Sequence, residues 1–319
     1  MLARTAGNLF WLARYMERAD YVARLLQVAG QMNAVRVDSD RDSEWQSALV
    51  AAGSEDDFFA THERADEASV IQFLAFDKSN PSSIACCIET ARRNARAVRT
   101  ALTADMWEAV NSTWQELGGF TASDEEIASG FDGDRLAEFL DWVKSRVGLF
   151  HGVTSNGMLR RDGFGFVRIG QFLERADNTA RLLDVKYHVR LPSVSDVGGV
   201  VDYYQWLAIL RVVGARRAYR VLFKGHVEPA HVAELLISRS EFPRSLAFCY
   251  QQITQHLDAI QSQDAGRAAE AKRQAHSLYA DLRFARIDDV IHDGLHEYLT
   301  DLIERTETLG ARIASGHLF

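Results

Sequence analysis

The sequence contains few of the residues that interrupt helices. Only four prolines occur among its 319 residues, and the stretches between them are rich in Ala, Leu, Arg and Glu. These residue types favour helices, whereas a protein built from β-strands would need many more turn-forming residues. The chain is also long enough to bury a sizeable core. The sequence therefore predicts an all-α protein.

The sequence also lacks an excess of positive charge and any long uninterrupted apolar segment. Its formal net charge is −8, so its overall field repels nucleic acids and anionic membranes. Near the start, Arg14, Glu17 and Arg18 interrupt the apolar run too early for a signal peptide or for a membrane-spanning helix of roughly 20 residues. We expect a cytoplasmic protein that binds neither nucleic acid nor membranes.

Cysteine is scarce, and sequence signatures of catalysis are absent. The three cysteines, two of them adjacent at Cys86 and Cys87, form neither a disulfide framework nor a CxxC pair, and we expect small core residues in a reducing compartment. No nucleophile elbow, Walker loop or dinucleotide-binding fingerprint occurs. If the protein is an enzyme, its site has no recognised local signature. We predict no cofactor.

A charged motif is present twice. ERADYVARLLQV, from Glu17 to Val28, and ERADNTARLLDV, from Glu174 to Val185, agree at every specified position of the pattern ERADxxARLLxV. The two copies lie 157 residues apart, which is about half the length of the chain. A match of this length exceeds ordinary similarity between helices and predicts an internal duplication.

Three further matches occur in the same order. They pair WQSALVAAG (45–53) with WLAILRVVG (206–214), NPSSIACC (80–87) with FPRSLAFC (242–249), and LAEFL (136–140) with LHEYL (295–299). Collinear matches at offsets between 157 and 162 predict one helical unit written twice, with pseudo-two-fold symmetry. No linker rich in Pro, Gly or Ser lies near the midpoint. We therefore predict a large helical bundle that forms one domain over 1–319, made of the pseudo-repeats 1–157 and 158–319.

The expected helices follow from the apolar pattern and the helix-breaking residues. They run over about 5–35, 42–52, 55–77, 81–118, 134–157, 163–188, 201–223, 228–238, 243–262 and 266–313, the last with breaks. Pro81 and Pro243 are expected at helix starts, where a missing N–H costs nothing. The segments 36–42, 117–126 and 188–199 are expected to be loops.

Each ERAD motif places two carboxylates and one guanidinium on one face of a helix. At about 100° per residue, Glu17, Asp20 and Arg24 lie within about 60° of one another. The same positions of the second copy are Glu174, Asp177 and Arg181. The rest of the first helix is apolar on most sides, so these charges are expected to be partly buried and to need partners.

Two interpretations of the ERAD charges are open. In the first, which we favour, Glu17 pairs with Arg175, or Glu174 pairs with Arg18, and such an ion pair fixes how the two halves dock. In the second, the arginines line a cleft for an anionic ligand, because a planar guanidinium binds carboxylates and phosphates through two hydrogen bonds.

The segment ETARRNARAVRTAL (89–102) carries Arg92, Arg93, Arg96 and Arg99 on one expected helix, three of them on one face. The matching segment QQITQHLDAIQS (251–262) has none of these arginines, so a single asymmetric site could have arisen here. Either the helix offers guanidinium groups and a nearby tryptophan to a phosphate or carboxylate, or it is a solvated basic face paired with Glu89 and neighbouring acids.

The segment MLRRDGFGF (158–166) precedes the second ERAD helix. Asp162 is expected to cap that helix, which is the interpretation we favour. Alternatively, Arg160 and Arg161 hold an anion together with the positive end of the helix.

Histidines occur four residues apart at His292 and His296, a spacing that could ligate a metal. However, helical di-metal bundles take Glu-x-x-His from two helices and further Glu residues from two more, and the matching LAEFL segment has no histidine. We predict no metal, and we expect the isolated His62 and His151 to be structural.

The charged positions of these motifs are the candidate site residues. Glu17 and Glu174 are the candidate catalytic residues. The candidate ligand-binding residues are Arg14, Glu17, Arg18, Asp20, Arg24, Arg92, Arg93, Arg96, Arg99, Arg160, Arg161, Glu174, Arg175, Asp177 and Arg181.

Four segments resemble, in order, the signature blocks of the bacterial alpha-E family, which is named for its helices and a Glu-Arg motif. They are MLARTAGNLFWLARYMERAD (1–20), FDKSNPSSIACCIETARRNARAVRTALTADMWEAVN (76–111), MLRRDGFGFVRIGQFLERADNTARLL (158–183) and GLHEYL (294–299). The resemblance runs from residue 1 to the C-terminus, with small departures such as Phe164 in place of the more usual Trp.

The resemblance also implies a functional setting. Such proteins are typically encoded beside a circularly permuted ATP-grasp protein and a transglutaminase-like cysteine peptidase, which implies a system that forms peptide or amide bonds. We therefore expect an accessory partner of the ATP-grasp protein that binds a peptide or small carboxylate, or a phosphate, through its arginine-rich helices. The alternative is an amide ligase or acyl transferase subunit in which Glu17 or Glu174 acts as a general base.

Overall fold

Helices make up the described chain. The computed structural model describes residues 2–33, 42–120, 133–188, 199–260 and 265–319. Helix accounts for 81% of the structure, and no strand occurs within these ranges. The all-α class predicted from the scarcity of proline is therefore confirmed.

The first half of the chain begins with a long helix, continues through shorter ones and ends with a second long helix. These helices are α1 (Ala3–Asn33), α2 (Asp42–Ala52), α3 (Glu55–Phe59), α4 (Glu67–Ala75), α5 (Ile84–Ala97), α6 (Ala104–Leu117) and α8 (Gly133–Gly157), with a 3₁₀ turn at Arg99–Ala101.

The second half also begins and ends with a long helix and has shorter helices between them. They are α9 (Asp162–His188), α10 (Val200–Val212), α11 (Arg216–Phe223), α12 (Pro229–Ile237), α13 (Leu246–Ala259), α14 (Ala265–Arg283), α15 (Ile287–Asp293) and α16 (Leu295–His317).

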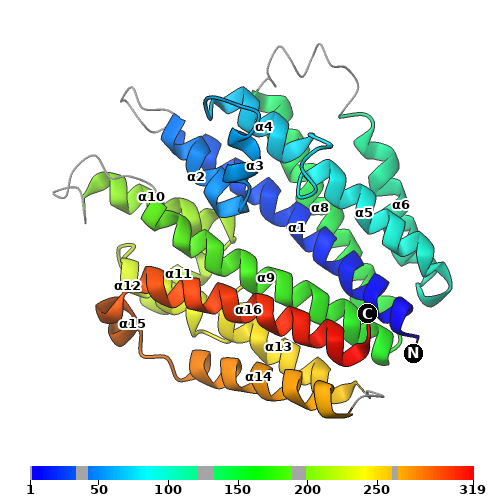
Figure 1. Ribbon diagram of the computed structural model, residues 1–319. Coiled ribbons are helices and arrows are strands. Elements are labelled where there is room, and N and C mark those ends of the chain that lie inside the picture. Colours follow the sequence, from blue (N-terminus) through cyan, green and yellow to red (C-terminus); the bar gives the residue numbers. More distant parts are fainter. Residues whose placement is uncertain (1, 34–41, 121–132, 189–198, 261–264) are drawn as a thin grey trace.

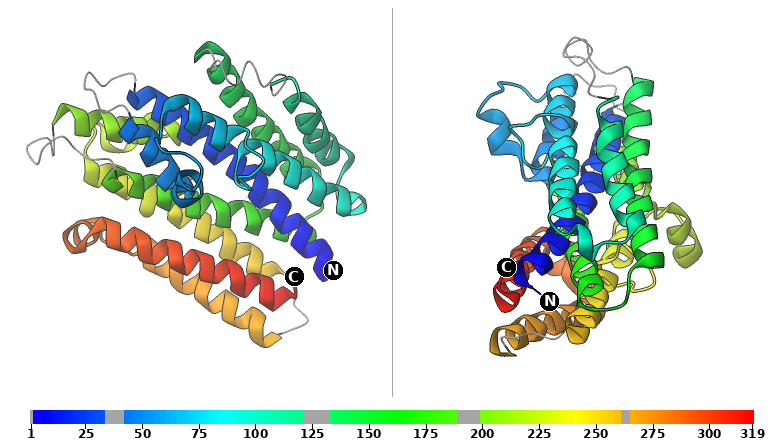
Figure 2. Two further views of the ribbon diagram at one scale, coloured as in Figure 1. Left: turned by 45° about the horizontal axis from the view of Figure 1, so that its top comes forward. Right: turned by 90° about the vertical axis from the view of Figure 1, so that its right-hand side faces the viewer.

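The two ERAD helices, α1 and α9, lie side by side in the middle of the molecule (Figure 1). Helices α5, α6 and α8 lie on the α1 side, and α13, α14 and α16 lie on the α9 side. Contacts also cross between the halves, because α2 packs on α9 and α10 packs on α1. Both termini lie at the same end of the bundle (Figure 2), where the rings of Phe10 and Phe319 are 5.4 Å apart.

The close approach of α1 and α9 depends on a residue without a side chain. A Cβ atom added at Gly170 of α9 would collide with the backbone carbonyl of Phe10 in α1. Around this crossing, buried apolar residues from both halves form one continuous cluster. The carboxylates of Glu17, Asp20 and Glu174 are therefore almost fully withdrawn from water and need partners within the protein.

The prediction of one helix over 55–77 is wrong, because this segment forms two helices. The chain turns between α3 and α4, and the Asp66 side chain accepts a hydrogen bond of 3.0 Å from the backbone N–H of Ser69. This bond satisfies a free N–H of the first turn of α4. The chain thus turns here although the segment 55–77 contains no proline or glycine.

The expected helices over 81–118 and 201–223 are also interrupted. The first is divided by the 3₁₀ turn and by Thr103, which caps α6 by accepting a hydrogen bond from Met106 N–H. The second is divided at Gly214, whose φ of +69° suits glycine because it has no Cβ. The expected breaks within 266–313 lie between α14 and α15 and at Gly294.

Pro81 and Pro243 precede their helices rather than start them. Helix α5 begins at Ile84 behind the cap Ser83, and α13 begins at Leu246 behind the cap Ser245. Pro81 and Pro243 each lie two residues before the cap. The predicted loops at 36–42, 117–126 and 188–199 fall mostly outside the described residues.

Two of the three cysteines are core residues, as expected. Cys87 and Cys249 are fully buried, and burial raises the pKa of each thiol to about 12. Cys86 differs from the expectation, because it is partly exposed. None of the described helices is long and apolar enough to cross a membrane.

Candidate functional site

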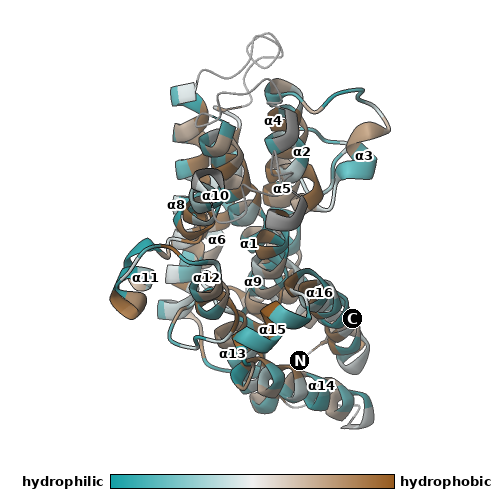
Figure 3. Cartoon of the chain, turned by 90° about the vertical axis from the view of Figure 1, so that its left-hand side faces the viewer, coloured by the Kyte–Doolittle hydropathy of each residue, from teal (hydrophilic) through white to brown (hydrophobic). Residues whose placement is uncertain are grey.

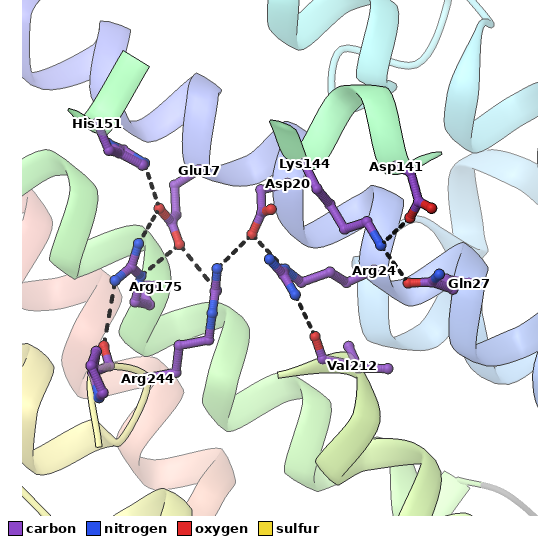
Figure 4. A network of polar contacts seen from close by, with 11 residues as sticks. Glu17, Asp20, Arg24, Gln27, Asp141, Lys144, His151, Arg175, Val212 and Arg244 are labelled. Carbon is purple, nitrogen blue, oxygen red and sulfur yellow. Dashed lines mark hydrogen bonds and ion pairs between the residues drawn. The ribbon is translucent and has the colours of Figure 1, made fainter. Parts of the chain in front are cut away.

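The Glu17 carboxylate is the centre of the first charge cluster (Figure 4). Its side chain is 1% exposed, and it accepts hydrogen bonds from the Nε and Nη2 atoms of Arg175 in α9 at 2.6 and 2.8 Å. His151 of α8 adds a bond of 2.9 Å, and Arg244, before α13, adds one of 3.3 Å. Each carboxylate oxygen therefore accepts two hydrogen bonds.

The Glu174 carboxylate is the centre of a second cluster with a different set of donors. It is also 1% exposed, and it accepts bonds from Arg18 Nε at 2.5 Å and Arg18 Nη2 at 3.2 Å. Arg14 Nε adds a bond of 2.6 Å. The predicted pairs of Glu17 with Arg175 and of Glu174 with Arg18 are thus confirmed.

These surroundings keep both glutamates ionised. Burial alone would raise the pKa of Glu17, but Arg175, His151 and Arg244 hold it well below its usual range. Burial likewise opposes ionisation of Glu174, yet Arg14 and Arg18 lower its pKa to about 2. A carboxylate with such a low pKa, whose oxygens are already occupied, is a poor acceptor for a substrate proton. The geometry therefore argues against a general-base role for either residue.

The aspartates of the two motifs also form the pairs expected from their spacing. Asp20 accepts from Arg24 Nε at 2.7 Å, and Asp177 accepts from Arg181 Nε at 2.9 Å. Only Asp20 has a second guanidinium, Arg244, at 2.8 Å. Burial raises the pKa of Asp177. Burial would also raise the pKa of Asp20, but Arg244 and Arg24 outweigh this effect and lower the pKa.

Two donors of the first cluster, Arg244 and His151, were not predicted from the sequence. Arg244 aligns with Ser82 within the matched segments NPSSIACC and FPRSLAFC. The match of LAEFL with LHEYL has an offset of 159, which aligns His151 with Gly310. Because Gly310 has no side chain, the guanidinium of Arg14 can lie next to it. The signal was present, because each donor is a difference between otherwise similar copies.

His151 is structural, as expected, and it is bonded to a charged group. Burial lowers the pKa of its imidazole, and the nearby Arg175 and Arg168 add to this effect against the opposing influence of Glu17. A neutral imidazole donates one hydrogen bond, so its Nε2 carries the proton that faces the Glu17 carboxylate.

The four arginines of the 89–102 segment do not come together. Arg92 donates to Asn111 at 2.9 Å and lies 3.9 Å from the Trp114 ring, while Arg93 and Arg96 are exposed. Arg99 lies beyond the end of α5, over Trp107, which corrects the prediction of one continuous helical face. None of the four forms an ion pair with Glu89 in the described structure.

Trp114 and Glu89 line a wide depression of about 800 Å³ between α4, α5 and α6. Cys86 lies in the same wall, together with Asp77 and Lys78. The charged groups of this depression include both signs, so it has no clear preference for an anion.

A smaller cavity of about 350 Å³ lies at the start of α9. It is lined by Arg160, Arg161, Asp162, Phe164, Gly165, Gln255, His256, Ala259 and Ile260. Asp162 is the first residue of α9 and not its cap, contrary to the favoured interpretation. The guanidinium of Arg160 lies 3.9 Å from the Phe164 ring centre, which fixes one cation at the rim of the cavity.

Arg168, about one turn beyond Phe164 along α9, adds positive charge behind this cavity. Its guanidinium lies 5.9 Å from the Phe164 ring centre, and its hydrogen bond goes to the neutral amide of Gln171 at 2.6 Å. Burial together with Arg175 and Arg160 lowers the pKa of Arg168 to about 10. Burial, Arg168 and Arg160 also lower the pKa of His256 to about 4. The cavity wall therefore holds one carboxylate, Asp162, beside the guanidinium groups of Arg160 and Arg161, and Arg168 adds a further cation nearby.

The two C-terminal histidines lie on different helices. His292 is in α15 and His296 is in α16, and Gly294 separates them with a φ of +114°. His296 instead contacts Asp184 of α9 at 2.6 Å. The i, i+4 geometry considered for a metal is thus absent, and the described residues contain no group of three or more His, Cys, Asp or Glu side chains placed to hold an ion.

The fold and these clusters define a class of all-helical proteins whose two central helices are joined by buried Glu–Arg ion pairs. The chain belongs to the Alpha-E family, described as a predicted alpha-helical domain with a conserved ER motif, whose family model matches residues 1–318. The family expected from the sequence blocks is therefore confirmed.

The similar proteins are mycobacterial. Uncharacterized protein Rv2567 of Mycobacterium tuberculosis is 26% identical over 324 residues, which cover 94% of this chain and 35% of that protein. Uncharacterized protein Mb2597 of Mycobacterium bovis matches with the same identity and coverage. The chain thus spans about a third of the length of these relatives. No solved structure matches the chain.

Proposed function

We propose that this protein is a noncatalytic helical partner that binds an anionic group, a carboxylate or a phosphate, in the cavity at the start of α9. The observation that carries the proposal is Arg168, a half-buried guanidinium with no carboxylate partner in the described structure and with a pKa lowered by burial and by neighbouring cations. An anion bound nearby would supply the missing negative charge.

The cavity supports this proposal in three ways. Its volume of about 350 Å³ suits a small group such as the end of a peptide. Arg160 and Arg161 at its rim can form charge-assisted hydrogen bonds with two oxygens of one anion. The first turn of α9 adds free backbone N–H groups and the positive end of a 27-residue helix.

The ERAD clusters support a structural role beside this cavity. Their arginines are occupied by Glu17, Glu174, Asp20 and Asp177. Removing one member of a buried pair costs about 3–5 kcal/mol, so an incoming ligand would have to offset that loss. We therefore assign ligand binding to Arg160 and Arg161, and docking of the halves to the ERAD residues.

The proposed partner is an ATP-grasp protein that forms peptide or amide bonds, as the resemblance implies, with a transglutaminase-like protein in the same system. The mycobacterial relatives are longer, and the matched region makes up 35% of each. In those proteins the matched region is joined to other polypeptide segments, which supports a role as a partner of other proteins. An ATP-consuming partner also agrees with the expected cytoplasmic location. In this proposal the chain presents a carboxylate or phosphate group to its partner.

Binding can be tested by calorimetric titration of the full chain with inorganic phosphate and with N-acetylalanine, a carboxylate beside a peptide bond. We expect both probes to bind. Binding should raise the pKa of His256, because a nearby anion stabilises the imidazolium, and an NMR titration measures this pKa. The double variant Arg160→Ala/Arg161→Ala should lose it, whereas Arg93→Ala/Arg96→Ala in α5 should not. Loss of binding only in the α5 variant, or no binding to either probe, would overturn the assignment.

The partnership needs a separate test. The chain and an ATP-grasp protein from the same genome can be purified together, and ADP release can be measured with and without the chain. We expect a stable complex and a change in ADP release. If the two proteins neither associate nor affect ADP release, the partnership is rejected while the anion site remains open to the titration above.

We also infer that residues 1–157 and 158–319 arose by duplication of one helical unit within a single domain. Besides the matched ion pairs, Gly53 and Gly214 both have positive φ values, of +62° and +69°. Ser83 and Ser245 both cap the following helix through a bond to the third residue on. Such agreement at aligned positions supports a pseudo-two-fold axis between α1 and α9.

A further inference from the structure

Helix α11 carries a basic surface that no other part of the described chain covers. It consists of Arg216, Arg217, Arg220 and Lys224, which are all exposed. None of these cations has an ion-pair partner among the described residues. Val221, which follows Arg220, is 66% exposed, so an apolar side chain lies beside these like charges. We name this set the α11 surface.

Helix α3 and the turn after it carry an acidic surface of similar design. It consists of Glu55, Asp56, Asp57 and Glu63, with Phe59 among them. The Phe59 side chain is 38% exposed. Glu55 accepts a hydrogen bond from Gln46 at 2.8 Å, and the other three acids have no ion-pair partner within the described ranges. We name this set the α3 surface.

The two surfaces occupy matching places in the two halves. At the offset of 161 that aligns Trp45 with Trp206, Glu55 matches Arg216, Asp56 matches Arg217 and Glu63 matches Lys224. The sign of the charge is reversed at all three positions. One chain thus carries an acidic and a basic version of the same structural element.

We propose that the α11 surface of one molecule docks on the α3 surface of a second copy of this chain. In this contact the acidic side chains of the α3 surface face the basic side chains of the α11 surface, and the exposed side chains of Val221 and Phe59 become buried. Burial of these apolar side chains and the attraction between the opposite charges both favour the contact. The acidic surface that fits α11 is present on the protein itself, which is why a second copy is the proposed occupant.

The positions of the α3 and α11 surfaces determine whether the molecules form a closed pair or a longer assembly. Figure 3 shows α3 and α11 on opposite sides of the molecule. A contact between unlike surfaces leaves one free surface of each kind at the ends, so association continues into a chain or closes into a ring. Both helices are short, so the interface is small, and we expect weak association that salt suppresses.

Sedimentation velocity over a range of protein concentrations tests this contact. At low ionic strength, about 0.02 M, the average mass of the wild-type protein should rise with concentration. At about 0.5 M salt the association constant should fall by about tenfold or more. Two charge-reversal variants extend the test: Arg216→Glu/Arg217→Glu/Lys224→Glu, which makes both surfaces acidic, and Glu55→Arg/Asp56→Arg/Glu63→Lys, which makes both surfaces basic.

Each variant alone should remain monomeric, because its two surfaces now repel each other. An equimolar mixture should associate, since every acidic surface can again meet a basic one. The variant Arg93→Glu/Arg96→Glu/Arg99→Glu changes the net charge by the same amount as the α11 variant but lies on another face, and it should still associate. Circular dichroism checks that all variants are folded.

Three results would overturn the proposal. The first is a wild-type protein that stays monomeric at low salt, which would leave a different acidic partner as the occupant of α11. The second is an α11 variant that associates as well as the wild type. The third is a mixture of the two variants that stays monomeric although both are folded.

Discussion

Glu17 and Arg175 join α1 to α9 through a two-point ion pair, with the two guanidinium nitrogens 2.6 and 2.8 Å from the two carboxylate oxygens. Arg18 and Glu174 make the corresponding contact in the other direction. The ERAD motif therefore acts between the two helices as well as along each one. Because both glutamates are buried, the pairs define one relative placement of α1 and α9.

We predict that Arg175→Lys destabilises the protein although it keeps the charge. Lysine offers a single ammonium and cannot bond both oxygens of Glu17 with the geometry of a guanidinium. We expect the free energy of unfolding to fall by ~2 kcal/mol, measured by urea denaturation. Arg93→Lys on the exposed face of α5 should stay within about 0.5 kcal/mol of the wild type. Equal effects of the two substitutions would contradict the prediction.

Acid should destabilise the protein through Glu174. Its pKa is about 2 in the folded protein, against an ordinary value of 4.5 for a glutamate in the unfolded chain, so the folded value is the lower one. Its contribution is complete above the unfolded pKa and is lost as pH falls from about 4.5 towards 2. The difference corresponds to ~3 kcal/mol.

Urea denaturation at several pH values checks this behaviour in the wild type and in Glu174→Gln. At pH 7 the variant should be less stable, because Arg14 and Arg18 are left without their counter-ion. Its stability should also depend less on pH between about 4.5 and 2 than that of the wild type. Parallel pH curves for the two proteins would show that Glu174 does not carry this dependence.

Much of the central cluster could be predicted from the sequence, for a physical reason. A helix fixes which side chains share a face, so the spacing within ERAD was sufficient to pair Asp20 with Arg24. The repeat of the motif then made Glu17 and Arg175 natural partners. Arg244 could not be found in this way, because it reaches Asp20 from the turn before α13, 224 residues away in the sequence.

Arg244→Ser tests the asymmetry that this residue creates, since serine is the residue at the matching position 82. Asp20 would keep Arg24 but lose a guanidinium at 2.8 Å. We expect its pKa to rise, and the protein to lose ~1–3 kcal/mol of stability. A carboxyl NMR titration measures the pKa of Asp20. Ser82→Ala should leave it unchanged, and an unchanged value in Arg244→Ser would remove the assigned role.

The helix breaks were harder to predict than the buried pairs. The caps at Asp66 and Thr103 each rest on one local hydrogen bond, and no proline or glycine marks either position in the sequence. The cavity at the start of α9 had a partial signal in Arg160 and Arg161. Its other wall, with His256, comes from α13, and the packing of α13 on α9 is a tertiary contact that no local pattern encodes.

Gly170→Ala should be among the most damaging single substitutions that add only a methyl group. The new Cβ would meet the backbone carbonyl of Phe10, and neither helix can retreat without moving the ion pairs between them. Overpacking of this kind costs typically ~1–3 kcal/mol. Gly152→Ala in α8 is the matched control, because nothing lies within 4 Å of its added Cβ and alanine favours helices by ~0.5–1 kcal/mol. Urea denaturation should show opposite signs for the two variants, and a Gly170→Ala protein as stable as the wild type would mean that α1 and α9 can separate without loss.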